Sequence, residues 1–212
     1  MTQRYWNRVD TNGDWLARDP RTGRPLGPPP GEDLAAMRAG LGRDAGEVPS
    51  MWRFYTCPID DQLAQRDQMS VEQRAEHAAL ALYGLHQQSR SASMHHPKAA
   101  LGNALYLLRS DGRFSAQAVD TRVNAAATAT SPAALLMRLR GLIDQLRVVN
   151  QPLNYDALMQ LIQDWHYEDG RRRARRRWAV EYQVWAKQND QQPAENQDSP
   201  GAGSGGRAAA TS

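Results

Sequence analysis

Apolar residues recur every three or four positions through most of the chain after residue 70, which is the spacing that gives an amphipathic helix its buried stripe. The longest such stripe carries Leu135, Leu139, Leu142, Leu146 and Val149. No segment alternates apolar and polar residues as a half-buried strand does. The pattern therefore predicts an all-α fold, a single helical bundle of about seven to nine helices.

Residues that favour helix starts precede several of these stripes. Ser70 and Gln73 have the spacing of a capping box, in which each side chain bonds the backbone N–H of the other. Proline is tolerated at the first helical position, so a helix is expected to begin at Pro97. Gly170 is expected to separate the last two helices. Further helix caps are expected at Ser131 and Asn154, and a weaker helix is expected from about Ser115 to Ala127.

Composition divides the chain into three regions. The stretch 21–31 (RTGRPLGPPPG) is too rich in proline and glycine for a helix, and it closes an N-terminal segment and linker over residues 1–31. Residues 32–187 form the expected α-helical domain. Residues 188–212 contain few apolar side chains, so a disordered C-terminal tail is expected there.

Between the first expected helix, residues 32–41, and Ser70 the sequence predicts irregular structure. Trp52, Phe54 and Tyr55 are expected to anchor this stretch against the core, because aromatic side chains bury a large apolar area. Residues 60–69 are mostly polar and are expected to form a mobile loop.

The net charge of +3 is unevenly distributed along the chain. Residues 70–187 carry 16 Lys and Arg against 10 Asp and Glu, whereas the regions on either side are slightly acidic. Arginine outnumbers lysine 24 to 2, and the planar guanidinium group matches phosphate geometry. The positive charge thus lies on the helical region, which favours a polyanionic partner.

The strongest basic feature is the run 171–177, in which six of the seven residues are arginine. At 100° per residue, Ala174 and Trp178 fall on an apolar stripe. Arginines flank this stripe at Arg171 and Arg175, and the arginine ridge on the opposite side consists of Arg172, Arg173 and Arg176. No acidic residue lies between positions 170 and 180 to neutralise the arginine ridge, so it is expected to bind a polyanion.

Seven further arginines complete the predicted nucleic-acid-binding surface. Arg140 and Arg147 lie seven residues apart on one flank of the leucine-rich helix. The others lie on helices or beside turns, at Arg38, Arg43, Arg109, Arg113 and Arg122. No base-reading motif accompanies them, so binding is expected to be backbone-directed, independent of sequence and salt-dependent. The tryptophans of the last two helices lie on apolar stripes and are expected in the core.

Groups suited to catalysis are sparse. The single cysteine, Cys57, excludes an internal disulfide and any cysteine-based zinc site. A nuclease built on Asp60, Asp61 and the His95-His96 pair remains as an alternative, but neither group has the spacing of a known metal or catalytic motif. We therefore expect no enzymatic activity, no metal and no cofactor.

Targeting signals are also lacking in the sequence. Residues 1–8 are polar and aromatic and lead into no apolar segment of the kind that follows a secretory signal. No apolar run approaches 18 residues, so no membrane span or membrane partner is expected. The chain is therefore expected to be cytoplasmic.

The order of these helices and basic segments resembles the CasB family, the small subunit of the type I-E CRISPR surveillance complex called Cascade. The resemblance covers residues 32–187 and rests on Leu34–Leu41 (LAAMRAGL), Ala81–His86 (ALYGLH), Leu101–Leu108 (LGNALYLL), Leu135–Leu146 (LLMRLRGLIDQL), Tyr155–Trp165 (YDALMQLIQDW) and Arg175–Tyr182 (RRRWAVEY). Each motif is loose by itself, and the order and spacing of the six make the resemblance specific.

The resemblance implies a helical, non-catalytic subunit, present in two copies beside guide RNA and other Cascade subunits. It also implies that basic residues hold the DNA of the R-loop, notably the displaced strand. By motif, these residues include Arg38, Arg140 and the run 171–177. Gly141 departs from the family pattern, and Arg138 or Arg147 would supply the missing charge. The alternative is a scaffold whose arginines contact guide RNA and neighbouring subunits rather than target DNA.

Overall fold

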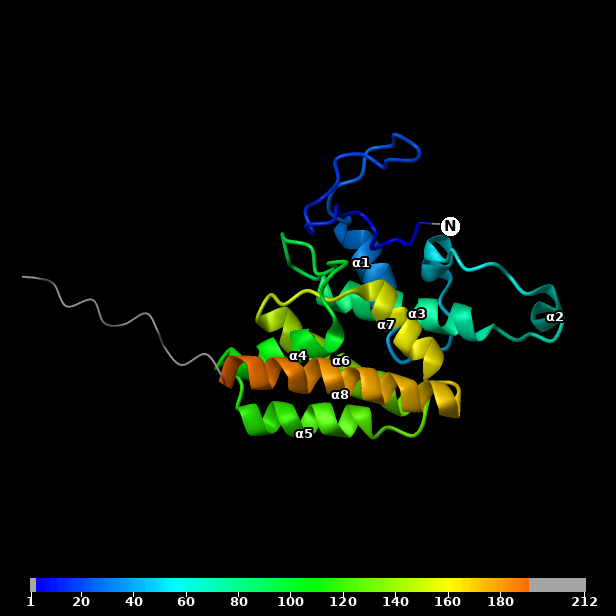
Figure 1. Ribbon diagram of the computed structural model, residues 1–212. Helices are drawn as coiled ribbons and strands as arrows, with labels where there is room; N and C mark the ends of the chain where they lie inside the picture. Colours follow the sequence, from blue (N-terminus) through cyan, green and yellow to red (C-terminus); the bar gives the residue numbers. More distant parts are fainter. Residues whose placement is uncertain (1–2, 191–212) are drawn as a thin grey trace, which may run out of the picture.

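The computed structural model describes residues 3–190, and this part of the chain is helical with no sheet (Figure 1). The elements in order are α1 (Gly31–Arg38), the 3₁₀ helix η1 (Pro49–Phe54), α2 (Asp61–Ala64), α3 (Val71–His86), α4 (Leu101–Ser110), α5 (Ala116–Ala127), α6 (Pro132–Val148), α7 (Tyr155–Asp164) and α8 (Glu168–Asp190). The all-α bundle predicted from sequence is confirmed. In the described residues no helix has both the length and the apolarity that a membrane span needs. The predicted disordered tail, residues 188–212, starts too early, because residues 188–190 are the end of α8, and the rest of it lies outside the described residues.

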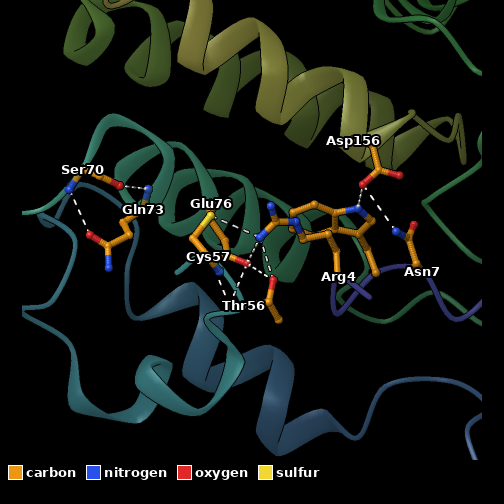
Figure 2. A network of polar contacts seen from close by, with 9 residues as sticks. Arg4, Asn7, Thr56, Cys57, Ser70, Gln73, Glu76 and Asp156 are labelled. Atoms are coloured by element: carbon orange, nitrogen blue, oxygen red, sulfur yellow. Dashed lines mark hydrogen bonds and ion pairs between the residues drawn. The ribbon is translucent and has the colours of Figure 1, made fainter. Parts of the chain in front are cut away.

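The helix caps predicted at Ser70, Ser131 and Asn154 form, and Ser115 provides a further one. Ser70 Oγ accepts the N–H of Gln73 at 3.1 Å, and Gln73 Oε1 accepts the N–H of Ser70 at 2.9 Å (Figure 2). Side-chain oxygens also accept an N–H from the first turn of α5, α6 and α7, at Ser115, Ser131 and Asn154. Because these bonds satisfy N–H groups that have no partner in the helix, they set the helix starts locally.

Two local predictions are wrong. The helix expected from Pro97 begins at Leu101 instead, because residues 96–99 form a turn held by the segment before α7. In this turn the N–H of His96 donates to Leu153 O at 2.9 Å, and Ala99 O accepts the N–H of Asn154 at 2.7 Å. The expected loop 60–69 contains the short helix α2, which Asp60 caps with its carboxylate.

Helix α3 is the centre of the bundle. Twelve of its 16 residues are buried, and α1, α6 and α7 pack against it. Gly84 makes the approach of α1 possible, since a Cβ there would lie 2.7 Å from Met37 Cβ. Helix α8 packs on α4 and α7, and it lies beside α5 (Figure 1). The hydroxyl of Tyr182 on α8 donates to the carboxylate of Asp120 on α5.

The N-terminal segment contributes directly to this core. Trp6 is completely buried, and its indole N–H donates to Asp156 Oδ1 at 2.9 Å. Arg4 reaches the buried carboxylate of Glu76 on α3, with 2.6 Å between Nη1 and Oε1 (Figure 2). Residues before the Pro/Gly-rich linker therefore pack against α3 and α7 as part of the bundle.

The aromatic residues in and directly after η1 differ in their exposure to solvent. Phe54 is buried and Tyr55 is half-buried, as the sequence predicts, but the side chain of Trp52 is 57% exposed. A 3₁₀ helix has three residues per turn, so Met51 and Phe54 share the buried face while Trp52 lies on another. The prediction that Trp52 anchors this stretch in the core is therefore wrong.

Two buried histidines are neutral in the folded protein. Burial lowers the pKa of His86 to about 3 and that of His95 to about 4. The N–H of Tyr155 donates to Nδ1 of His95 at 3.1 Å, so protonation of that nitrogen would remove its acceptor at the start of α7. A positive charge at a helix N-terminus is also unfavourable.

These histidines predict a loss of stability in mild acid. The unfolded chain binds protons near the ordinary histidine pKa of 6.5, and the folded chain does so only at lower pH. The free energy of unfolding should therefore fall between pH 7 and pH 5, by about 2 kcal/mol for each histidine. Urea unfolding at pH 7, 6 and 5 measures this slope. His86→Gln should make it shallower, whereas the same change at the partly exposed His96 should leave it steep. Equal slopes in all three proteins would contradict the prediction.

Candidate nucleic-acid interface

The faces of α8 match the sequence prediction. Ala174 and Trp178 are buried, with 0% and 3% of their surfaces exposed, and Trp165 at the end of α7 is also completely buried. The arginine ridge, Arg172, Arg173 and Arg176, is exposed on the opposite side. The side chain of Trp185 lies outside the described residues.

The two arginines that flank the apolar stripe bond to the fold itself. Arg175 donates from Nε to Ala127 O and from Nη2 to Ala129 O, each at 2.8 Å, and its guanidinium lies 5.4 Å from the centre of the Trp165 ring. Arg171 donates to Trp165 O at 3.1 Å. Because the carbonyl groups at the end of α5 have no partner in that helix, Arg175 acts as its C-terminal cap.

Helix α8 begins before Gly170, which contradicts the predicted break there. Gly170 is buried in the first turn, where a Cβ would lie 2.1 Å from Asp164 O, so only glycine allows α8 to follow α7 so closely. The early start places acidic residues beside the arginine ridge. Arg172 lies 2.8 Å from Glu168 Oε1 and 3.6 Å from Asp169 Oδ1. The arginine ridge is therefore partly neutralised at its N-terminal end, which the sequence analysis missed.

Three further predicted site residues form ion pairs within the bundle. Arg109 Nε lies 3.0 Å from Asp120 Oδ1, and Arg147 Nη2 lies 2.8 Å from Asp144 Oδ1. Arg113 lies 3.3 Å from Asp111 and also donates to Val148 O at 2.7 Å. These side chains stabilise turns and helix ends, so they are less available to an external anion than the sequence predicts.

The remaining predicted arginines make no hydrogen bond or ion pair through their side chains with any other described residue. Arg173 and Arg176 project from α8, Arg122 is exposed on α5, and Arg38 is half-buried at the end of α1. Arg43 and Arg140 are exposed and lie together in a hollow of about 810 Å³. The structure thus brings together two predicted residues that are about one hundred positions apart in sequence.

The hollow lies where four parts of the fold meet. Its wall is formed by the loop 40–47, one face of α3, the N-terminal half of α6 and the end of α7 with His166. Arg74 on α3 joins Arg43 and Arg140 there. The sequence analysis missed Arg74, although it is an exposed basic position on a helix whose other residues are mostly buried.

The charges in the hollow are mixed, since carboxylates at Asp44, Glu47 and Asp67 line it together with the three arginines. Apolar side chains of Leu136 and Met137 complete the surface. A hollow with guanidinium groups, carboxylates and apolar atoms can bind a ligand that itself combines negative charge with hydrogen-bond donors and an apolar surface.

The loop that carries Arg43 is fixed by His77 of α3. Nε2 of His77 contacts Gly40 O at 3.1 Å and Arg43 O at 3.0 Å, while Nδ1 contacts the Tyr55 hydroxyl at 2.7 Å. Carbonyl groups only accept hydrogen bonds, so Nε2 carries the proton and Nδ1 accepts from Tyr55. Burial lowers the pKa of His77, which keeps this neutral tautomer in place.

Two residues of the nuclease alternative, Asp60 and His95, have roles in the fold. Asp60 accepts the N–H groups of Gln62 and Leu63 at the start of α2. His95 is buried and accepts an N–H from α7. Across residues 3–190 no cluster of three histidine, cysteine, aspartate or glutamate side chains could hold a metal ion.

These features define an all-helical protein whose free arginines gather on one helix face and in one hollow. Residues 33–182 match the family model of CRISPR-associated protein Cse2. The chain therefore belongs to the Cse2 family, and the CasB resemblance predicted from its sequence is confirmed.

Solved structures agree with this assignment. CasB from Thermobifida fusca is 27% identical, with a TM-score of 0.58 over 72% of this chain and 84% of that one. A Cse2-family protein from Thermus thermophilus shares the fold, with 22% identity, a TM-score of 0.53 and coverage of 72% and 86%. A chain of a CRISPR RNA-guided surveillance complex also shares it, with 22% identity, a TM-score of 0.54 and coverage of 74% and 86%. No curated protein sequence matches this chain significantly.

Proposed function

We propose that this chain is a non-catalytic subunit of the type I-E CRISPR surveillance complex Cascade. Two copies would associate with guide RNA and the other subunits, and would stabilise the R-loop through contacts with target DNA, notably the displaced strand. Membership of the Cse2 family supports this proposal, as does the similarity in fold to a chain of a CRISPR RNA-guided surveillance complex.

The observation that carries the proposal is the set of exposed arginines without partners elsewhere in the described residues. Arg173 and Arg176 extend from α8, and Arg43 and Arg140 lie at the hollow. Each can neutralise a phosphate and release a counterion, which gives affinity without reading base sequence. A subunit that must act on any target sequence requires this kind of binding.

Modest contacts of this type are sufficient for the proposed role. An RNA–DNA heteroduplex is about as stable as the DNA duplex that it replaces, so R-loop formation is nearly balanced in free energy. Arginines that hold the displaced strand disfavour its return to the target strand. Shifting the equilibrium toward the R-loop in this way requires no covalent bond to be broken, in keeping with a non-enzymatic subunit.

A second candidate function is that of a scaffold whose arginines contact guide RNA and neighbouring subunits. Exposed apolar side chains near the arginines favour it, since Met137 is 70% exposed in the hollow and Val180 is 61% exposed one turn after Arg176. Crosslinking in the assembled complex separates the two candidates. Crosslinks to the displaced strand support the R-loop proposal, and crosslinks confined to RNA and protein support the scaffold.

Reconstitution tests the proposed function directly. The guide-RNA complex is assembled without this chain and bound to matched target DNA, and the chain is then added. Permanganate reactivity of thymines in the displaced strand and the dissociation rate of the R-loop are followed. Slower dissociation with protected thymines is expected. Slower dissociation with fully reactive thymines would contradict binding of the displaced strand. No change in the thymine reactivity or in the dissociation rate would contradict the proposal as a whole.

Replacing the arginine ridge with alanine should shorten the lifetime of the R-loop. Because Arg172 already pairs with Glu168 and Asp169, the loss is assigned to the phosphate contacts of Arg173 and Arg176, and it should reduce the slope of log affinity against log salt by about 1.4 on a single strand. The control is Arg147→Ala, because Arg147 already pairs with Asp144. An R-loop lifetime that stays unchanged in the Arg172→Ala/Arg173→Ala/Arg176→Ala variant would contradict the assignment of the ridge to DNA.

A further inference from the structure

Trp52 is an exposed aromatic residue with a fixed orientation. Its side chain is 57% exposed, and its indole N–H donates to Gly46 O at 2.9 Å. The hydrogen bond holds one edge of the ring against the loop 40–47 and leaves much of the indole open. A ring held in this way loses little conformational freedom when a flat ligand stacks on it.

The loop that holds Trp52 is also the loop that carries Arg43. Gly46 contacts Trp52 on one side, and a Cβ at Gly46 would lie 3.2 Å from Met69 Cε, which lines the hollow. Arg43 lies three residues before Gly46 and lines the same hollow. The indole of Trp52, which belongs to η1, therefore contacts the loop 40–47 three residues after Arg43.

This segment is rigid. His77 bonds the carbonyl groups of Gly40 and Arg43, and the N–H of Gly46 donates to the Tyr55 hydroxyl at 3.4 Å. Tyr55 in turn donates to His77, which links the two ends of the loop through buried or half-buried groups of α3 and η1. The relative positions of Trp52 and Arg43 are thus set before any ligand binds.

We propose that Trp52 is a stacking platform for an unpaired base of single-stranded nucleic acid, with the adjoining phosphate bound by Arg43. The inference rests on the proposed function and adds that the bound nucleic acid is an unpaired strand. Every base has an aromatic face, so stacking is compatible with binding that does not read sequence. Bases in a duplex are already stacked, and the platform therefore selects an unpaired strand.

Arginines beside Trp52 in sequence and on the loop that it contacts favour this ligand over a protein partner. Arg53, the next residue, is 57% exposed although it pairs with Asp33 at 2.7 Å. An exposed indole that contacts the loop of Arg43 offers the combination of stacking and phosphate contacts found in single-strand binding sites. An apolar protein surface would gain from the indole but would bury the charge of Arg43, whose side chain has no partner among the described residues.

Binding of a labelled oligothymidylate to the full chain, followed by fluorescence anisotropy, tests the platform. Trp52→Ala should weaken binding about 5- to 100-fold, and Trp52→Phe should stay within about threefold of the unaltered chain. The matched control is Tyr167→Ala, because Tyr167 is 59% exposed but lies in the turn between α7 and α8. This control should bind as the unaltered chain does.

An oligonucleotide of abasic residues isolates the stacking contribution. It keeps the phosphates and lacks the bases, so the loss caused by Trp52→Ala should disappear on it. An unchanged affinity of Trp52→Ala for oligothymidylate would overturn the platform, as would an equal loss on the abasic strand. A defect of Trp52→Ala in complex assembly with normal oligothymidylate binding would assign the indole to a protein partner instead.

The same measurements separate this inference from the proposed function. If arginine-ridge variants lose oligothymidylate affinity while Trp52→Ala does not, only the platform is overturned. If the unaltered chain shows no salt-dependent binding to any single strand, both the platform and the proposed function are overturned.

Discussion

Replacing Trp6 with alanine is expected to destabilise the bundle by about 3–5 kcal/mol, because the change leaves a large cavity in a packed core. Trp6 is completely buried and lies against the rings of Tyr83 and Tyr155, with centroids 6.4 and 5.9 Å away. The substitution also leaves Asp156 without its indole donor. The free energy of unfolding in urea, measured at pH 7, tests this expectation.

The matched control is Trp15→Ala in the same N-terminal segment. Trp15 also donates its indole N–H, to Ser91 O at 2.7 Å, but its side chain is only half-buried. The Trp15→Ala substitution should therefore lower the free energy of unfolding by about 1 kcal/mol, the usual contribution of one such hydrogen bond. A loss for Trp6→Ala as small as that expected for Trp15→Ala would contradict the burial of Trp6 in the core.

Replacing Glu76 with alanine is expected to cost about 3 kcal/mol, because several donors then lose a shared buried acceptor. Glu76 accepts the N–H groups of Thr56 and Cys57, the Thr56 hydroxyl at 2.5 Å and the Arg4 guanidinium at 2.6 Å (Figure 2). This loss of unfolding free energy is at the low end of the range for breaking a buried ion pair, since the Arg4 side chain is 25% exposed and water can reach it. Glu72→Ala, one turn earlier on the exposed side of α3, is the matched control and should cost less than about 0.5 kcal/mol.

The pH dependence of the Glu76 effect follows from the same contacts. Burial alone would raise the pKa of Glu76, but hydrogen bonds from Thr56 and Cys57 and the charge of Arg4 hold it below the ordinary value of 4.5. The stabilisation is therefore complete above about pH 4.5 and is lost as the pH falls through the folded-state pKa. The difference in unfolding free energy between the unaltered chain and Glu76→Ala should shrink below pH 4.5. A difference that grows with acidity would contradict this account.

The helices of this protein could be predicted from sequence because their signals are local. Caps at Ser70, Ser131 and Asn154 act within three residues, and apolar stripes repeat with the helical period. Predictions failed where a distant segment decided the outcome. The start of α4 depends on bonds to residues 153–154, and the start of α8 depends on the close contact of Gly170 with Asp164.

The candidate site could be predicted only in part, for the same reason. Helical geometry alone places the arginine ridge opposite Trp178, and the structure agrees. Geometry along one helix does not reveal that Arg109 pairs with Asp120 across a turn, or that Arg74 joins Arg43 and Arg140. Partners on other elements determine which guanidinium groups are free.

The sequence by itself determined the helical class, most of the helix caps and the face of α8 that carries the arginine ridge, because each depends on residues a few positions apart. It also determined the family, because the order of motifs along the chain is itself a property of the sequence. Only the tertiary structure decided that Trp6 is buried and Trp52 is exposed, although both are tryptophans outside the main helices. Burial depends on which distant surfaces meet, and the hydrophobic pattern of a single segment does not contain that information.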